Sequence, residues 1–207
     1  MQAAVLIATL LAAGTNWWSR IADNETVEQW SKPLTTVLVI GLALVSGAPH
    51  SHVAIAVVAL VLCLMGDIAL MPVVDNFVAG LAAFLLGHVV FIVLFVRYGL
   101  PHPALAGVAL LFAAVVAGTV GRVIVAGATH QDHALRIPVL AYLTVILSMS
   151  AVGWATGNWW VIVGSVLFVI SDSVLGWRQF VQDRSWMGLA VMVTYHGAIA
   201  SLALSLW

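Results

Sequence analysis

The sequence predicts an all-α polytopic membrane protein, and three observations lead to this fold class. Hydrophobic residues make up 63% of the 207 residues and charged residues only 7%, against roughly 25% charged residues in soluble domains. Eight separate segments are each apolar over about the 20 residues that a helix needs to cross a bilayer core. These segments are continuously apolar, so they lack the alternation of polar and apolar residues that a transmembrane barrel requires.

The eight expected transmembrane helices lie near residues 2–18, 33–48, 53–71, 76–97, 103–126, 136–153, 159–177 and 185–207. The breaks between them hold mostly Pro, Gly or Asn, which are turn residues. The first segment begins at Met1 but lacks the basic start and the small-x-small cleavage site of a signal peptide. Trp17 and Trp18 near its end are typical of a membrane-interface anchor. No loop is long enough for a soluble domain, so we expect a single transmembrane domain over residues 1–207.

The charged residues exclude other classes of protein and indicate an orientation. Seven Lys and Arg against eight Asp and Glu give a net charge of −1, so there is no basic patch for a nucleic-acid backbone. The cations gather in every second loop, at Arg20, Lys32, Arg122, Arg136, Arg178 and Arg184, while the other loops and the termini carry only Arg97. The positive-inside rule then places the cation-rich loops in the cytoplasm and both termini outside. We expect a multi-pass protein of the bacterial inner (cell) membrane.

Polar residues recur in the two halves of the chain at about half its length. Three pairs match in residue type and position: Lys32 with Arg136, each closely followed by a Pro, Asp67 with Asp172, and His88 with His196. Four helices per half give both halves the same orientation. We therefore infer two parallel repeats, over residues 1–100 and 101–207, an arrangement known in transporters. The alternative is coincidence among apolar helices of low complexity.

Two aspartates inside hydrophobic helices, Asp67 and Asp172, are the candidate catalytic residues. A charged Asp costs at least about 2.5–3.5 kcal/mol at mid-membrane. An Asp at such a position therefore indicates a functional or structural role. Both lie near helix ends on the cation-rich side, which places the two carboxyl groups at one depth. When two carboxyl groups are neighbours, one stays protonated and can act as the acid, while the other is ionised and can act as the base. The alternative is that each carboxylate pairs with Lys32 or Arg136 and only holds helices together.

Further polar side chains are candidates for binding a ligand. Lys32 and Arg136 are expected at helix starts, where they either extend to the membrane surface or bind an anionic phosphate head group. Tyr142 lies roughly 9 Å deeper than Arg136 and is either a packing residue or a hydrogen-bond donor to the same cavity. His88 and His196 lie at mid-helix, as packing residues or as part of the site.

Two His and two Asp also form a metal-ligand set. However, no HxxxH or HxxE spacing places two ligands on one helix face, and we expect neither a metal nor another cofactor. The remaining histidines, in the breaks between spans, are interpreted as surface residues: His50, His52, His102, His130 and His133.

An ordered set of residues over roughly 30–205 carries a resemblance to a known family. The set is Lys32-Pro33; Gly66-Asp67 with Leu70; Phe77, Gly80, Phe84, Gly87-His88 and Phe91; Pro138-Val139, Tyr142, Ile146 and Met149; Gly164, Phe168 and Ser171-Asp172; and Tyr195. Together these residues resemble the YhhN family, the membrane lysoplasmalogenases. The family tends to carry a Gln shortly after the last Tyr. Here Ile199 stands at that place, and His196 is the expected replacement.

The resemblance implies hydrolysis of the vinyl-ether bond of a lysoplasmalogen, which releases a fatty aldehyde and glycerophospho-ethanolamine or -choline. Vinyl ethers hydrolyse by protonation of carbon to an oxocarbenium ion, to which water adds. This chemistry needs one protonated carboxyl group as acid and one carboxylate that holds the water and stabilises the cation. Asp67 and Asp172 are expected to fill these two roles.

The expected substrate-binding residues are Lys32, His88, Arg136, Tyr142, Tyr195 and His196. The expected partners are a lysophospholipid substrate and the surrounding membrane lipid, with no nucleic acid. Three other classes of function stay open. A small transporter or channel would line a pathway with the matched polar residues. An intramembrane aspartyl protease also carries Asp on two helices, but its strict Gly-x-Gly-Asp pattern is missing because position 64 is Leu. A pure scaffold is disfavoured by the buried charges.

Overall fold

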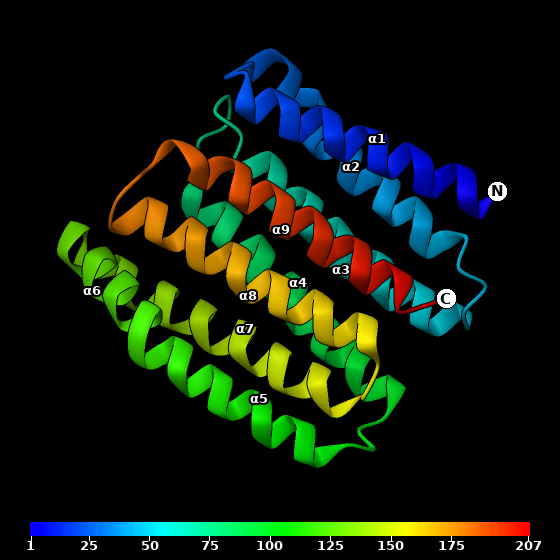
Figure 1. Cartoon of the computed structure of the whole chain (residues 1–207). Coiled ribbons are helices and arrows are strands. Elements are labelled where there is room, and N and C mark those ends of the chain that lie inside the picture. Colours follow the sequence, from blue (N-terminus) through cyan, green and yellow to red (C-terminus); the bar gives the residue numbers. More distant parts are fainter.

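The computed structural model describes residues 1–207 and consists of helices and their connecting turns, without strands. The elements are α1 (Gln2–Ile21), α2 (Glu25–Leu44), α3 (His50–Ala69), α4 (Phe77–Tyr98), α5 (Pro103–Val116), η1 (Ala117–Gly121), α6 (Arg122–Gln131), η2 (His133–Leu135), α7 (Arg136–Ala155), α8 (Trp159–Phe180) and α9 (Ser185–Leu204). Successive long helices run antiparallel in one bundle, and both termini lie at the same end (Figure 1). The all-α fold class is therefore confirmed.

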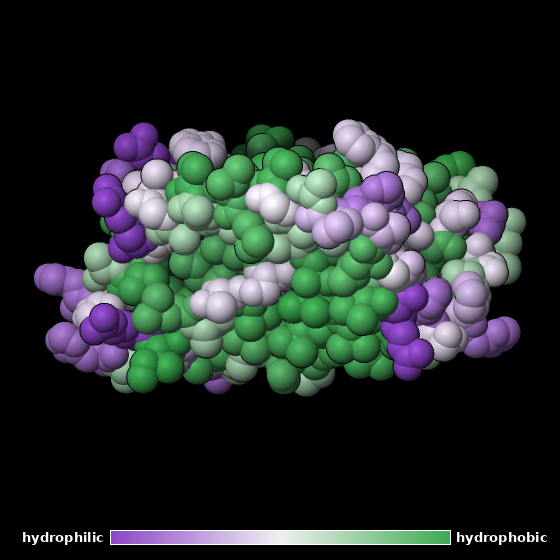
Figure 2. Space-filling model, turned by 90° about the horizontal axis from the view of Figure 1, so that it is seen from below, coloured by the Kyte–Doolittle hydropathy of each residue, from purple (hydrophilic) through white to green (hydrophobic).

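Six helical segments are long and apolar enough to cross a membrane. They are α3, α4, the continuous segment Pro103–Gln131, η2 with α7, α8 and α9. The helices α1 and α2 each have 20 residues but do not reach the same mean hydropathy, because α1 ends and α2 begins with polar residues. One face of the bundle shows a broad apolar belt between two polar ends (Figure 2), as expected for a membrane protein.

The second helix begins at Glu25 rather than near residue 33, which corrects the expected position of Lys32. Asn24 caps this helix because its side chain accepts a hydrogen bond from the backbone N–H of Val27 at 3.1 Å. Pro33 therefore lies inside α2. Lys32 is only 5% exposed, so it lies within the bundle and does not extend to the membrane surface from a helix start. The polar stretch that was expected to be a loop forms the first turns of the helix.

The fifth helix continues beyond its expected end near residue 126 and reaches Gln131 through the π-helical segment η1. Segments of this kind are rare and occur frequently at functional sites. Gly121, at the end of η1, is buried, and a Cβ atom there would lie 2.7 Å from Leu143 Cδ2. The glycine therefore permits the close approach of this helix to α7.

Contacts between the two halves of the chain form the centre of the bundle. The helix α2 packs on α9, and α4 packs on α7. Phe91 and Phe95 of α4 and Phe168 of α8 are fully buried there. The neighbouring polar side chains of both halves are consequently enclosed by the same core.

Candidate active site

Asp67, on α3, is held by side chains from two other helices. Thr36 Oγ1 of α2 and Tyr195 OH of α9 donate hydrogen bonds to Asp67 Oδ2 at 2.6 and 2.7 Å. Lys32 Nζ lies 3.6 Å from Asp67 Oδ1 and donates to the Asp67 backbone carbonyl at 3.4 Å. The Asp67 side chain is 1% exposed. A carboxylate that accepts two hydrogen bonds and faces an ammonium group has a fixed position and a compensated charge.

Asp172, on α8, has fewer partners. Tyr142 OH of α7 donates a hydrogen bond to Asp172 Oδ2 at 2.6 Å, and His88 Nε2 of α4 lies 3.9 Å from the same oxygen. Asp172 Oδ1 accepts no hydrogen bond from the protein, and the side chain is 12% exposed. Neither ring nitrogen of His88 has a hydrogen-bond partner. One oxygen of Asp172 is therefore free to meet a ligand.

Both carboxyl groups line one cavity, which we call the aspartate cavity. Its wall includes Lys32, Tyr195, Arg20 and Arg178 together with Asp67 and Asp172. A second cavity, the apolar cavity, shares Leu70, Asp172 and Leu175 with the first. Its other lining residues come from α4, α6, α7, α8 and η1, and include Phe77, Leu81, Ile124, Leu143 and Ile146. Asp172 therefore stands at the border between a polar and an apolar space.

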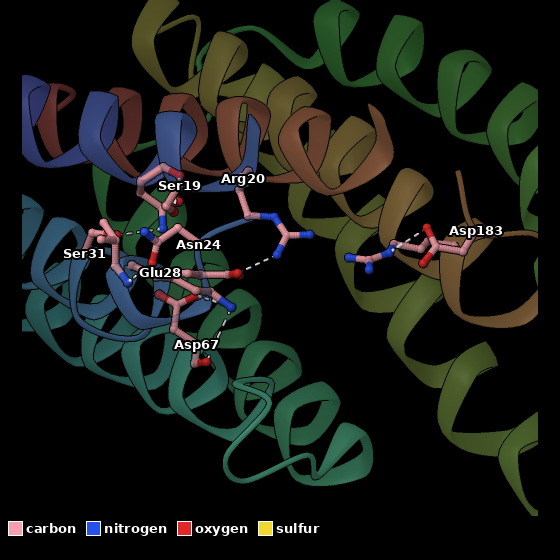
Figure 3. A network of polar contacts seen from close by, with 11 residues as sticks. Ser19, Arg20, Asn24, Glu28, Ser31, Asp67 and Asp183 are labelled. Atoms are coloured by element: carbon pink, nitrogen blue, oxygen red, sulfur yellow. Dashed lines mark hydrogen bonds and ion pairs between the residues drawn. The ribbon is translucent and has the colours of Figure 1, made fainter. Parts of the chain in front are cut away.

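Two arginines that are not among the residues predicted for the site, Arg20 and Arg178, line the aspartate cavity. Arg20, near the end of α1, pairs with Glu28 of α2, and Arg178, near the end of α8, pairs with Asp183 at 2.9 Å. All four residues also line an adjoining cavity, which shares Leu70 and Leu175 with the aspartate cavity and which we call its opening. Figure 3 shows Arg20 and Glu28 on one side and Asp183 on the other. The sequence feature that could have identified these arginines is their position in the last turns of their helices, at the same end of the bundle as the two aspartates.

Four of the predicted site residues lie outside the aspartate cavity. Tyr142 is one of them, but it lines the apolar cavity and bonds Asp172. Arg136 begins α7 and lines a separate groove with Arg122. His196 is 3% exposed and accepts a hydrogen bond at Nδ1 from Trp17 Nε1 at 3.1 Å. His88 is fully buried and lies behind Asp172, against the rings of Tyr142 and Phe168.

Five predicted residues come together in the structure. Each of them lines the aspartate cavity or bonds one of its carboxyl groups: Lys32, Asp67, Tyr142, Asp172 and Tyr195. The structure does not bring the two His and two Asp together as metal ligands. No group of three or more His, Cys, Asp or Glu side chains is arranged to hold a metal ion. The Lys32–Asp67 pair matches the ion-pair alternative considered for that aspartate, whereas Arg136 and Asp172 form no such pair.

The fold and the site define a helical membrane protein with two carboxyl groups in one cavity that adjoins an apolar one. The chain belongs to the YhhN family, whose model matches residues 27–206. The matched region includes both aspartates and nearly all of α2 to α9. The helix α1, with Arg20, precedes it.

Three curated relatives are lysoplasmalogenases named TMEM86B. The human protein is 30% identical over 132 residues, which cover 62% of this chain and 53% of the relative. The mouse protein is 37% identical over 79 residues, covering 37% and 33%, and the rat protein is 35% identical over 79 residues, covering 37% and 32%. The chain thus matches between about a third and about half of the length of these relatives. No solved structure matches it significantly.

Proposed function

We propose that the protein is a membrane-embedded hydrolase that cleaves the vinyl-ether bond of lysoplasmalogens to a fatty aldehyde and glycerophospho-ethanolamine or -choline. The observation that carries this proposal is the border at Asp172 between the aspartate cavity and the apolar cavity. A single-chain amphiphile needs a polar and an apolar space that meet at its reactive bond. The names of the curated relatives support the same activity.

In the proposed mechanism Asp172 is the acid. Its Oδ1 carries no hydrogen bond from the protein and borders the apolar cavity, so a proton on this oxygen can pass to the vinyl carbon of a bound chain. Protonation of that carbon leaves an oxocarbenium ion. Tyr142 holds the carboxyl group in place by a hydrogen bond to its other oxygen, and the His88 ring lies beside that oxygen.

Asp67 is the proposed carboxylate that serves the second step. Thr36 and Tyr195 fix its orientation, and it faces the same cavity as Asp172. It stabilises the oxocarbenium ion and takes one proton from the water that adds to the cation. The resulting hemiacetal collapses to the aldehyde and the free glycerol hydroxyl. The proton held by Asp67 returns to Asp172, which restores the acid.

The head group is proposed to bind at the opening of the aspartate cavity. Arg20 and Arg178 supply guanidinium groups that suit a phosphate, while Glu28 and Asp183 supply carboxylates for the ammonium of ethanolamine or choline. Lys32 is buried beside Asp67, whereas each guanidinium group keeps further N–H donors after pairing with one carboxylate. These two arginines therefore replace Lys32 and Arg136 as the proposed phosphate ligands.

We also propose that all eight long helices cross the membrane and that the two halves are repeats. The helices α1 and α2 expose large apolar side chains on their outer faces, including Ile7, Leu11 and Leu34. The packing of the halves corresponds, because α2 contacts α9 as α7 contacts α4. The aspartates correspond as well: Asp67 bonds side chains of α2 and α9, and Asp172 is contacted from α7 and α4.

The test of function is release of fatty aldehyde by the purified protein in detergent from a lysoplasmenylethanolamine. We expect aldehyde and glycerophosphoethanolamine in equal amounts. The matched control substrate is the 1-alkyl lysophosphoethanolamine of the same chain length, which has no double bond to protonate and should stay intact. Absence of aldehyde with folded protein would contradict the proposal. Movement of the intact lysolipid across sealed vesicles would then favour the transporter alternative.

A further inference from the structure

A groove between α6 and α7 gathers positive charge without a matching negative charge. It is lined by Arg122, Thr129, His130, His133 and Arg136, along with small and apolar residues. No Asp or Glu lines this α6–α7 groove. Arg122 and Arg136 form no ion pair, in contrast to the arginines at the opening of the aspartate cavity. Both side chains are exposed, so their guanidinium groups are available to an outside ligand.

The two arginines lie at the same level of the bundle. The start of α5 and the end of α7 are joined where the His102 N–H donates to the Ala155 carbonyl at 3.0 Å. Arg122 follows Pro103 by about as many residues as Arg136 precedes Ala155. At 1.5 Å per residue both lie about 28 Å from that joint, which is close to the thickness of the hydrocarbon core. They are therefore placed where lipid phosphates lie.

The rest of the groove suits the upper part of a lipid chain. Leu140 and Leu143 lie on the same face of α7 as Arg136, at helical spacing. Gly121 and Leu143 line both the groove and the apolar cavity. A chain that descends from a head group at the arginines would therefore contact the outer wall of the apolar cavity.

We propose that the α6–α7 groove binds the phosphate head group of an anionic membrane phospholipid, with Arg122 and Arg136 as its ligands. A zwitterionic head group fits less well, because no lining carboxylate can pair with an ammonium group. The opening of the aspartate cavity differs in this respect, since Glu28 and Asp183 lie beside its arginines. The groove is a separate site, and its occupation does not depend on the proposed hydrolase activity.

The experiment is thermal unfolding of the purified protein in detergent with three probes: dioctanoyl phosphatidylglycerol, dioctanoyl phosphatidylcholine and inorganic phosphate. A ligand that binds the folded state raises its Tm. We expect phosphatidylglycerol alone to raise the Tm with a saturating dose dependence. Arg122→Gln and Arg136→Gln should each raise the apparent Kd for phosphatidylglycerol by about tenfold or more, since each removes a charge-assisted hydrogen bond.

A control variant locates the effect. Arg97→Gln removes an exposed arginine at the opposite end of the bundle. It should keep the wild-type response to phosphatidylglycerol, and Arg136→Lys should keep more of that response than Arg136→Gln. An equal response to phosphatidylcholine, or an unchanged response in the Arg122→Gln/Arg136→Gln variant, would overturn the proposal. A shift in Tm of the same size with inorganic phosphate would show that the groove binds free anions, and this would overturn the lipid as occupant.

Discussion

Thr36 shows which roles of single residues can be predicted from the sequence and which cannot. Threonines inside helices commonly bond the carbonyl one turn back, and Thr9, Thr119 and Thr144 do so here. Thr36 instead donates to Asp67 on another helix. That both aspartates face the interior of the bundle could be predicted, because a charge exposed to lipid is costly. Their partners Tyr142 and Tyr195 were also predicted as site residues, whereas Thr36 could not be separated from ordinary helix residues without knowing which helices are neighbours.

The first prediction concerns the two aspartates. Asp172→Asn and Asp67→Asn should each lower kcat for aldehyde release by about 10²–10⁴-fold, because Asn keeps the size of Asp but neither gives nor takes the proton. The double variant should be little slower than either single variant, since residues that act as a unit have non-additive effects. Turnover of lysoplasmenylethanolamine is the measurement.

The control for these variants is Asp23→Asn. Asp23 is exposed in the turn between α1 and α2, where its φ of 48° is a backbone conformation that Asn also tolerates. Wild-type turnover is expected. If either active-site variant keeps wild-type kcat, that aspartate has a structural role only.

The second prediction concerns Arg20 and the glycine beneath it. A Cβ atom at Gly188 of α9 would lie 2.2 Å from Arg20 Nη2, so Gly188→Ala should displace the guanidinium group from the opening. Arg20→Gln should lower kcat/KM about ten- to a hundredfold, mainly through KM, because the phosphate is remote from the bond that breaks. Gly188→Ala should change KM in the same direction by a smaller factor.

A substrate without phosphate separates head-group binding from general damage. Both variants should cleave a 1-alkenylglycerol as the wild type does. Gly14→Ala, on the same helix as Arg20 and with no atom within 4 Å of the added Cβ, is the matched control for the glycine. Equal losses on both substrates would show that Arg20 supports the fold rather than the head group.

At the scale of helices, the boundaries of most spans follow from the sequence. Hydrophobic runs begin after Asn76 and Asn158 and end at Gly99, and these residues cap α4 and α8 in the structure. The start of α2 does not follow from the sequence, because its first two turns are polar and polar residues are also typical of loops. The sequence also does not determine how each helix is rotated about its own axis. Arg136 therefore matched Lys32 in sequence but lies in another groove.

The third prediction tests how closely two of these helices must approach. A Cβ atom at Gly127 of α6 would lie 2.3 Å from the backbone oxygen of Phe180 in α8, and a backbone atom cannot turn aside as a side chain can. Gly127→Ala should destabilise the fold by about 1–3 kcal/mol through overpacking, measured as a lower unfolding midpoint. Gly107→Ala, where nothing lies within 4 Å, should be neutral or stabilising by up to about 1 kcal/mol. Equal midpoints would contradict this contact.

At the scale of the whole molecule, the antiparallel order assigns the loops to two ends. The termini share one end of the bundle (Figure 1), along with the loop around Gly99 that carries few charges. The opening of the aspartate cavity, with Arg20 and Arg178 in its wall, lies at the other end. The orientation predicted from the cations therefore also predicts from which side a lysolipid head group enters. We propose that this side is the cytoplasm.

The last prediction tests this orientation with single cysteines. Cys63 is fully buried, and a Cys63→Ala background removes its contribution. His50→Cys and Gln131→Cys lie at exposed positions on opposite ends of the bundle. In intact cells a charged, membrane-impermeant maleimide should label His50→Cys, whereas Gln131→Cys should be labelled only after permeabilisation, because cation-rich loops stay in the cytoplasm. The opposite pattern would place Arg20 and Arg178 outside, and a head group would then enter from the external leaflet.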